Sequence, residues 1–298
     1  MTRLTRRPHA GEAWSGRARV IDAHHHLWRF NESEFGWIDE RMSKLRRDYL
    51  ANDLCKAMAV AKVDGTVVVQ ARESVEETKW LLDCARETPV IAGVVGWAPL
   101  TWDNLAAIID SFDGGDTLVG LREVVQGLPD GYFDRPEFNR GVRALTERGL
   151  TYDILIYQHQ LEEAIRLVDR HPNQRFVLDH AGKPKIAQAE IEPWRTNLLA
   201  LSKRANVTCK ISGLVTEADW SDWTPESLRP YLDACVDAFG PHRLMAGSDW
   251  PVCLVATGYS AWWDVLRQYF EDFSSDEFAA VFGGTAVGVY GLQDAPQR

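Results

Sequence analysis

Short runs of apolar and β-branched residues recur along the chain, and amphipathic stretches separate them. The runs are nearly all apolar, which is typical of strands that are buried on both faces. Eight such runs predict strands at Val20–Ala23, Thr66–Gln70, Ile91–Trp97, Val119–Val124, Tyr152–Tyr157, Phe176–Asp179, Val207–Ile211 and Leu244–Gly247.

Helix signals lie between these runs. Ser74 and Glu77 have the spacing of a capping box and predict a helix that continues to Glu87. Pro225 is placed to open another helix, which Gly240 closes. Eight strands that alternate with helices predict an α/β fold in which a parallel sheet closes into a (β/α)₈ TIM barrel. An open doubly wound sheet is the alternative, but the glycine-rich turn expected after its first strand is absent.

The extent of this pattern predicts the domain organisation. Residues 19–292 are expected to form one barrel domain, because no repeat, low-complexity tract or linker interrupts them. Residues 1–18 contain four arginines and no apolar segment, so we expect a flexible N-terminal extension rather than a secretory signal. Residues 293–298 are expected to be a C-terminal tail.

Composition argues against several classes of protein. With 45 % hydrophobic and 26 % charged residues, the 298-residue chain is typical of a soluble globular enzyme. The net charge of −10 argues against nucleic acid or an anionic membrane as a partner, and no apolar run is long enough to span a bilayer. Five cysteines without a CxxC pair indicate reduced thiols in the cytoplasm. We expect a small-molecule partner, and the sequence leaves open whether the chain forms a homo-oligomer.

Polar residues follow several of the apolar runs, at the carboxyl ends where barrel enzymes carry their chemistry. The first run ends in His24, His25 and His26. Because side chains alternate along a strand, His24 and His26 share one face and His25 points the other way. Two imidazoles on one face are placed to bind one divalent metal ion. The other runs contribute Arg122, Glu123, His159, His180 and Asp249.

Hydrolysis is the chemistry that these side chains support. A metal ion held by imidazoles and a carboxylate lowers the pKa of bound water to about 7. Asp249 is placed to accept a proton from the attacking water and to return it to the leaving group. Arg122, Lys183 and Lys210 are candidates for stabilising the developing oxyanion or for binding a substrate carboxylate.

Three stretches carry a resemblance to a known family: DAHHHLW at 22–28, LDHAGKP at 178–184 and GSDWPV at 247–252. Through them the chain resembles the amidohydrolase superfamily of metal-dependent (β/α)₈ hydrolases. Within it, the chain is similar to the sugar-lactone hydrolases, a branch related to L-fuconolactonase, L-rhamnonolactonase and 2-pyrone-4,6-dicarboxylate lactonase. The resemblance implies carbohydrate catabolism, in which a fucono-, rhamnono- or galactono-lactone is opened to its sugar acid.

The resemblance also implies roles for individual residues. His24 and His26 match the family's HxH pair of metal ligands. His180 matches its strand-six histidine, and Asp249 matches its strand-eight aspartate, which is the general base as well as a ligand. Glu123 stands where related sequences often carry histidine, and we expect it to be a metal ligand or a substrate contact.

His159 is a further catalytic candidate, although related lactonases often carry other residues in that loop. The resemblance implies one divalent metal ion, with zinc expected before manganese. The branch also contains hydrolases that need no metal, in which the histidines would polarise the lactone carbonyl. Trp28 and Trp250 lie beside the motifs, and their flat indoles suit the apolar face of a sugar ring, so we expect both to contact the substrate.

Two alternative functions remain. The same superfamily contains metal-dependent decarboxylases of aromatic or unsaturated acids, and release of carbon dioxide would identify one. A catalytically silent barrel that only binds its ligand is the second alternative. The complete set of His24, His26, His180 and Asp249 argues against it, because a silent relative has no need of the base and the histidines together.

Overall fold

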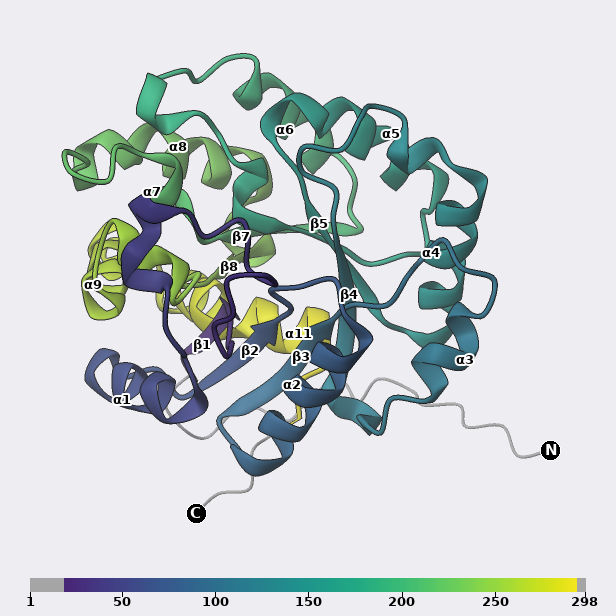
Figure 1. Ribbon diagram of the computed structural model, residues 1–298. Helices are drawn as coiled ribbons and strands as arrows, with labels where there is room; N and C mark the ends of the chain where they lie inside the picture. Colours follow the sequence, from purple (N-terminus) through teal and green to yellow (C-terminus); the bar gives the residue numbers. More distant parts are fainter. Residues whose placement is uncertain (1–18, 294–298) are drawn as a thin grey trace.

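Eight parallel strands form the centre of the computed structural model, which describes residues 19–293. Each strand pairs with the next one along the chain. Helices surround the strands (Figure 1), so the alternating pattern has produced the predicted (β/α)₈ barrel. The strands are β1 (Ile21–His25), β2 (Gly65–Val69), β3 (Ile91–Gly96), β4 (Leu118–Val124), β5 (Thr151–Leu155), β6 (Phe176–Leu178), β7 (Val207–Ile211) and β8 (Leu244–Ala246).

The helices begin where the sequence signals place them. The hydroxyl of Ser74 accepts a hydrogen bond from the backbone N–H of Glu77, and Gly240 follows the second predicted helix at a φ of +64°. The α-helices are α1 (Ala51–Ala61), α2 (Val75–Glu87), α3 (Leu105–Asp110), α4 (Pro136–Arg148), α5 (Leu161–Arg170), α6 (Trp194–Ser202), α7 (Leu214–Glu217), α8 (Pro225–Phe239), α9 (Tyr259–Tyr269), α10 (Ser275–Ala279) and α11 (Thr285–Tyr290). Shorter helical turns are η1 (Glu40–Leu45), η2 (Gly115–Thr117), η3 (Tyr132–Asp134), η4 (Gln158–Gln160), η5 (Asp179–Gly182), η6 (Ile186–Gln188), η7 (Pro241–Arg243), η8 (Val252–Val255) and η9 (Ala280–Gly284).

The first and last strands meet at their carboxyl ends. His25 and Trp250 form a parallel bridge, and the backbone N–H of Asp249 donates to the carbonyl of His24 at 2.8 Å. The backbone N–H of His26 donates to the carbonyl of Trp250 at 2.6 Å. These bonds close the barrel directly beside the histidines, so the loop after β8 is held against β1.

An irregularity in β1 sets the direction of its side chains. Asp22 pairs with Thr66 and His25 pairs with Val68, so β1 has one residue more than β2 between these pairs. An extra residue of this kind interrupts the strict alternation of side chains. Ala23 belongs to the apolar cluster inside the barrel, yet His24, its neighbour, also faces inward, toward the charged groups described below.

The barrel interior is apolar apart from the charged groups near its carboxyl end. Strand residues fill it together with residues of α11 and the segment after it, which lie at the centre of the ring in Figure 1 (yellow). A larger apolar cluster lies between the strands and the outer helices. Within residues 19–293, no helix is long and apolar enough to cross a membrane. The interior cluster comprises Ile21, Ala23, Val67, Val69, Val95, Val119, Val177, Met245, Ala286, Tyr290 and Leu292.

Candidate active site

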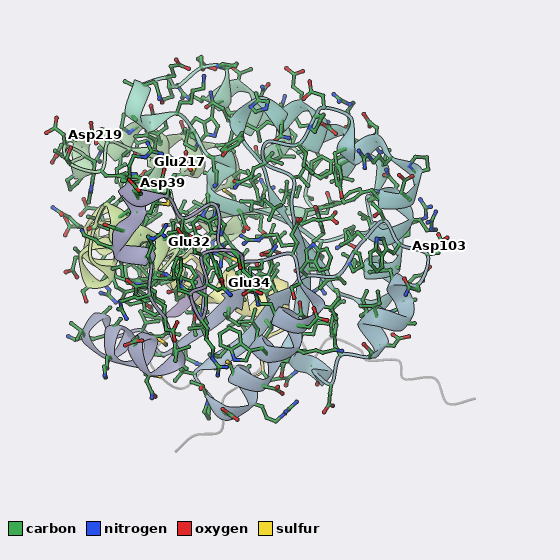
Figure 2. The ribbon with its side chains drawn as sticks, viewed as in Figure 1. Glu32, Glu34, Asp39, Asp103, Glu217 and Asp219 are labelled. Carbon is green, nitrogen blue, oxygen red and sulfur yellow. The ribbon has the colours of Figure 1, made fainter. Side chains whose placement is uncertain are left out.

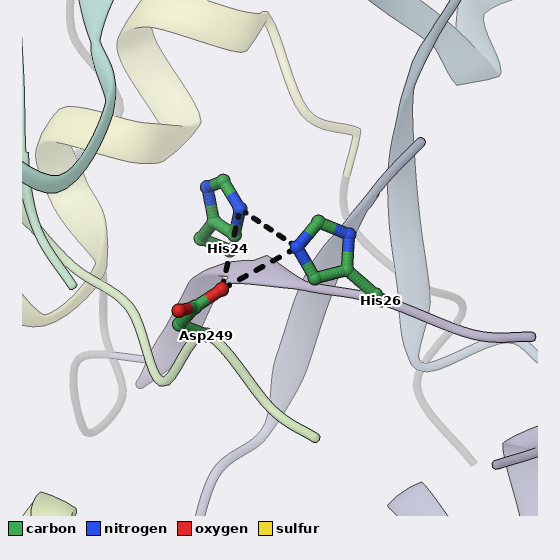
Figure 3. Close-up of side chains that lie close together, drawn as sticks. All are labelled: His24, His26 and Asp249. Carbon is green, nitrogen blue, oxygen red and sulfur yellow. Dashed lines mark hydrogen bonds and ion pairs between the residues drawn. The ribbon is translucent and has the colours of Figure 1, made fainter. Parts of the chain in front are cut away.

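Four side chains converge at the carboxyl ends of β1, β6 and β8. Nε2 of His24 lies 3.3 Å from Nε2 of His26. These two nitrogens lie 3.8 and 3.4 Å, respectively, from Oδ1 of Asp249 (Figure 3). His180 adds a third imidazole, whose Nε2 is 3.9 Å from the same oxygen. All four residues are buried, so the strand-end positions have become one compact group of donors.

Hydrogen bonds at the far side of two rings aim their Nε2 atoms at this group. Nδ1 of His26 lies 2.8 Å from the carbonyl oxygen of Val69, and Nδ1 of His180 lies 2.9 Å from the hydroxyl of Ser212. Because a carbonyl only accepts, His26 donates through Nδ1, and Nε2 is the nitrogen that faces the group. His25 is buried outside the group, and its Nε2 has no hydrogen-bond partner within residues 19–293.

Burial favours the neutral form of two imidazoles of the site, His24 and His180. It lowers the pKa of His180 to about 4 and lowers the pKa of His24 well below its ordinary value. Burial alone would raise the pKa of Asp249, but His180 and His26 hold that pKa below its ordinary value. At neutral pH His24 and His180 are therefore neutral and Asp249 is ionised. These are the forms in which such groups bind a metal ion or accept a proton.

A network of charges lies next to His24 inside the barrel. Lys210 donates to Asp153 at 2.6 Å and lies 3.0 Å from Oδ1 of Asp179. Arg122 donates to the other carboxylate oxygen of Asp179 at 2.9 Å. Oδ1 of Asp179 lies 3.4 Å from Nδ1 of His24. The network thus joins three buried strands to the ring of His24 and holds that ring in place.

This network corrects the expected role of Lys210. Its ammonium is fully buried between Asp153 and Asp179, so it supports the site from within and does not reach a substrate. Arg122 is buried as well, but its Nη1 lies 3.3 Å from Nε2 of His24. Arg122 therefore borders the donor group.

Glu123 lies on the other face of β4. Arg122 occupies the interior face, so its neighbour points outward, where the Glu123 carboxylate interacts with the phenol of Tyr132. Burial raises the pKa of Glu123 to about 7. The groups placed to hold a metal within residues 19–293 do not include it. Strand alternation thus directs Glu123 away from His24, His26 and Asp249, which argues against the expected role as a metal ligand.

The backbone adopts uncommon conformations where it presents the site. His180 has a φ of +52° and Asp249 has a φ of +57°, in the left-handed region that few non-glycine residues adopt. Gly213, after β7, has a φ of +64° and lies against both. A Cβ on Gly213 would lie 2.6 Å from Nδ1 of His180 and 3.2 Å from Oδ2 of Asp249. Only glycine leaves these two side chains room at this position.

The tryptophans expected to contact substrate are packed instead. Trp28 is fully buried, and its indole N–H donates to the carbonyl of Arg47 at 2.9 Å. The ring of Tyr49 packs edge-on against Trp28 and Trp250, at 5.6 and 5.2 Å between ring centroids. Both tryptophans therefore attach the loops after β1 and β8 to the barrel, which corrects their assignment. Trp220 is the tryptophan that lines the cleft described next.

A cleft of about 900 Å³ opens between the loops that follow β5, β6 and β7. His159 is exposed in its wall, where its ring stacks on Tyr157 at 6.1 Å between centroids, outside the donor group. Lys183 lines the same cleft and directly follows η5, which carries His180, so the cleft adjoins the loop that presents this donor. Of the expected substrate contacts, Lys183 is the one that the structure places in an open cavity.

Sequence reasoning did not assign Asp153, Asp179, Ser212 or Gly213. A signal was present for two of the network residues, since Asp153 and Lys210 each stand alone inside an apolar strand. Single opposite charges on two buried strands are costly unless they pair, so their presence predicts an internal ion pair. Ser212 and Gly213 act through contacts that no local pattern marks.

The donor set fits a tetrahedral divalent ion. Ligand atoms about 2.0–2.2 Å from such an ion lie about 3.3–3.6 Å from one another. The three separations among His24, His26 and Asp249 are 3.3, 3.4 and 3.8 Å. Imidazole nitrogen and carboxylate oxygen are donors that zinc takes in proteins. These residues therefore form a group that is able to hold a metal ion.

Comparison with known proteins gives consistent results. The chain is 38 % identical over 286 residues to an L-fucono-1,5-lactonase of Burkholderia multivorans, covering 92 % of this chain and 96 % of that protein. An L-fucono-1,5-lactonase of Burkholderia ambifaria is 36 % identical over 277 residues, covering 91 % and 94 %. A crystal structure of an amidohydrolase from Burkholderia multivorans with bound zinc superposes with a TM-score of 0.89 at 39 % identity, covering 93 % of this chain and all of that one.

The family model described as amidohydrolase matches residues 21–292, which is nearly the whole of the described structure. That range runs from β1, with its two inward-facing histidines, to the end of the barrel. The fold, the donor group and the sequence match agree, and the protein therefore belongs to the amidohydrolase family.

Proposed function

We propose that the protein hydrolyses a sugar lactone of the L-fucono-1,5-lactone type to its sugar acid. The observation that carries this proposal is the convergence of His24, His26, His180 and Asp249 in a chain so similar to two L-fucono-1,5-lactonases. In this reaction water adds to the ester carbonyl and the bond from that carbon to the ring oxygen breaks. The products are a carboxylate, a free hydroxyl and a proton.

Asp249 is the general base of the proposed reaction. It is buried, and its pKa lies below the ordinary value, so it is ionised at neutral pH. Its Oδ1 faces the point on which the Nε2 atoms of His24, His26 and His180 converge. It takes a proton from the attacking water and then delivers it to the departing ring oxygen, which becomes the new hydroxyl.

Positive groups beside Asp249 stabilise the negative charge that develops on the carbonyl oxygen. Arg122 borders Nε2 of His24 at 3.3 Å, and its position is fixed by Asp179. Lys183 approaches from the cleft, where it orients the hydroxyl groups of the substrate. Donors that are already in place before the reaction stabilise the transition state more than water does.

Zinc is the metal that we propose for this site, with His24, His26 and Asp249 as ligands and His180 as the additional donor. Zinc bound to the related amidohydrolase structure supports this choice. Such an ion, when bound, supplies a Lewis acid that polarises the carbonyl and lowers the pKa of water.

A cytoplasmic location is part of the proposal. All five cysteines are free thiols, and three of them, Cys209, Cys235 and Cys253, are buried. Proteins of oxidising compartments seldom keep their thiols reduced, so this pattern supports a reducing compartment.

A hydrolysis screen with a pH indicator tests the proposed function. Aldono-1,4- and 1,5-lactones are offered to the protein as purified, after chelation, and after zinc or manganese is restored. We expect rapid acid release from L-fucono-1,5-lactone, its loss on chelation and its recovery with zinc. Asp249→Asn should reduce the rate by about 10²-fold or more, the usual scale for a general base.

The screen has two outcomes that contradict parts of the proposal. Acid release that survives complete chelation would overturn the metal assignment, but the proposed lactonase activity would stand. No acid release from any lactone would overturn the lactonase, and carbon dioxide release from aromatic acids would then identify a decarboxylase. Metal content measured on the same samples separates a metal-free protein from an inactive one.

A further inference from the structure

The cleft beside the active site contains a lysine that is already paired with a carboxylate. Nζ of Lys183 lies 3.8 Å from Oε1 of Glu217, which ends α7. The two side chains are only 17 % and 23 % exposed. Lys183 also lies over the ring of Tyr157, 5.6 Å from its centroid, so its position is held from two sides. An ion pair this shielded from water is screened less than a pair on the open surface.

The other cationic side chains of the cleft are paired as well. Arg41 contacts Asp39 at 2.7 Å, and Lys185 contacts Glu190 at 3.2 Å. Within residues 19–293, Arg41, Lys183 and Lys185 are the lysine and arginine residues that line this cleft. Figure 2 labels Asp39 and Glu217, and also Asp219 on the same side of the molecule. A negatively charged ligand in this cleft would therefore meet no unpaired lysine or arginine.

The cations next to the donor group are neutralised in the same way. Arg122 and Lys210 face Asp179 and Asp153, so two positive charges oppose two negative charges. Asp249 remains as a further negative charge at the mouth of the site. A carboxylate that enters the cleft therefore gives up its hydration and gains no new ion pair with a lysine or arginine of the cleft.

We propose that Glu217 is a specificity-determining residue, which neutralises Lys183 so that the cleft accepts uncharged, hydroxyl-rich lactones and binds carboxylates weakly. This inference rests on the proposed function, and it names how the same site discriminates between substrates. Lys183 donates hydrogen bonds to hydroxyl groups, and Glu217 accepts hydrogen bonds from them. The pair therefore suits a ligand with several hydroxyl groups.

The same pairing favours release of the product. Hydrolysis converts a neutral ester into a carboxylate, so the ligand gains a negative charge while it is still in the cleft. Glu217 then repels it, and Lys183 is not free to hold it. A site that binds the substrate better than its own product is less inhibited as the product accumulates.

Glu217→Gln tests this inference because it frees Lys183 without changing the size of the side chain. We expect the sugar acid derived from the lactone to bind about five- to tenfold more tightly to this variant, as product inhibition or calorimetry measures it. The KM for the neutral lactone should change less than the affinity for the sugar acid, because the glutamine amide still hydrogen-bonds to hydroxyl groups. The double variant Glu217→Gln, Lys183→Gln should return sugar-acid binding to the level of the unaltered protein.

Glu190→Gln is the matched control. It makes the same change of charge and frees Lys185, another lysine of the cleft, but that pair is 53 % and 48 % exposed. Water and salt already screen such a pair, so its removal should leave sugar-acid binding within about twofold. Equal effects of the two variants would overturn the inference, because they would reflect net charge alone. No gain of sugar-acid binding in Glu217→Gln would overturn it as well.

Calorimetry with the sugar acid separates this inference from the proposed function. Binding of the acid requires no turnover, so it is measurable even if the protein hydrolyses no lactone. Tighter binding of the sugar acid to Glu217→Gln, together with absent hydrolysis, would support the role of Glu217 in neutralising Lys183. The same result would reject the proposed lactonase activity. Hydrolysis with unchanged acid binding would support the lactonase and reject the role of Glu217.

Discussion

Nε2 of His24 and Nε2 of His26 lie 3.3 Å apart, although the ring of His25 stands between them in the sequence. The extra residue in β1 and the carbonyl of Val69 bring the two nitrogens to one point. His25 lies outside that point, buried and with burial lowering its pKa to about 3. Three identical neighbours in the sequence thus have different surroundings.

Substitution of the three histidines should separate these roles. We expect His24→Asn and His26→Asn each to reduce kcat/KM for the lactone by about 10²-fold or more. His25→Asn should keep activity within about tenfold, with its main effect on thermal stability. Steady-state kinetics and metal content of the three variants measure this. Comparable losses in His25→Asn and His26→Asn would contradict the assignment of faces.

Gly213→Ala should damage the site more than it damages the fold. Its Cβ would lie 2.6 Å from Nδ1 of His180, at a φ of +64°. Gly291, which follows α11, has the same φ and is also left-handed, and its Cβ would meet no atom within 4 Å, so Gly291→Ala is the control for backbone strain alone. We expect both variants to lose about 1–2 kcal/mol of unfolding free energy. Only Gly213→Ala should lose activity, and equal activities would contradict the steric argument.

Loss of Lys210 should destabilise the protein strongly. Lys210→Met leaves Asp153 and Asp179 without their shared cation in the interior, which typically costs about 3–5 kcal/mol. Tyr290→Phe removes one hydrogen bond to Asp153, so we expect a loss of only about 1 kcal/mol. Urea denaturation measures both variants. A stability of Lys210→Met close to that of the unaltered protein would show that the network is replaceable.

Stability should depend on pH through Glu123. Its pKa is about 7 in the folded chain and near 4.5 when exposed, so between these values the unfolded chain has lost a proton that the folded chain retains. The stabilisation that this retained proton on Glu123 gives the folded chain is complete below about pH 4.5 and disappears as the pH rises through 7. Glu123→Gln, which stays neutral, should therefore gain stability relative to the unaltered protein at pH 8, on the order of 2–3 kcal/mol.

The comparison at two pH values checks this prediction. At pH 5 the difference between Glu123→Gln and the unaltered protein should fall below about 1 kcal/mol. The exposed residue Glu147 in α4 supplies the control, and Glu147→Gln should have little effect at either pH. A constant difference between pH 5 and pH 8 would show that Glu123 titrates normally in the folded protein.

The sequence by itself determined the barrel, because the periodicities of strands and helices are local patterns that each segment shows in its own residues. It also determined His24, His26, His180 and Asp249 as the group to examine, because parallel strands bring their carboxyl ends to one rim. The boundaries of the eight predicted strands differ from the observed boundaries of the eight strands by only a few residues. Apolar runs and polar strand ends carry this information directly.

Tertiary structure alone decided which of the remaining polar residues face the site. The inward direction of Arg122 and the outward direction of Glu123 depend on the registers of β3 and β4, which shift near Val95. The partners of Lys210 lie on other strands, so whether it meets a substrate or two carboxylates is a matter of packing. The pairing of Lys183 with Glu217 likewise joins two loops. Such contacts depend on how distant segments of the chain pack together, and the sequence of one segment does not predict them.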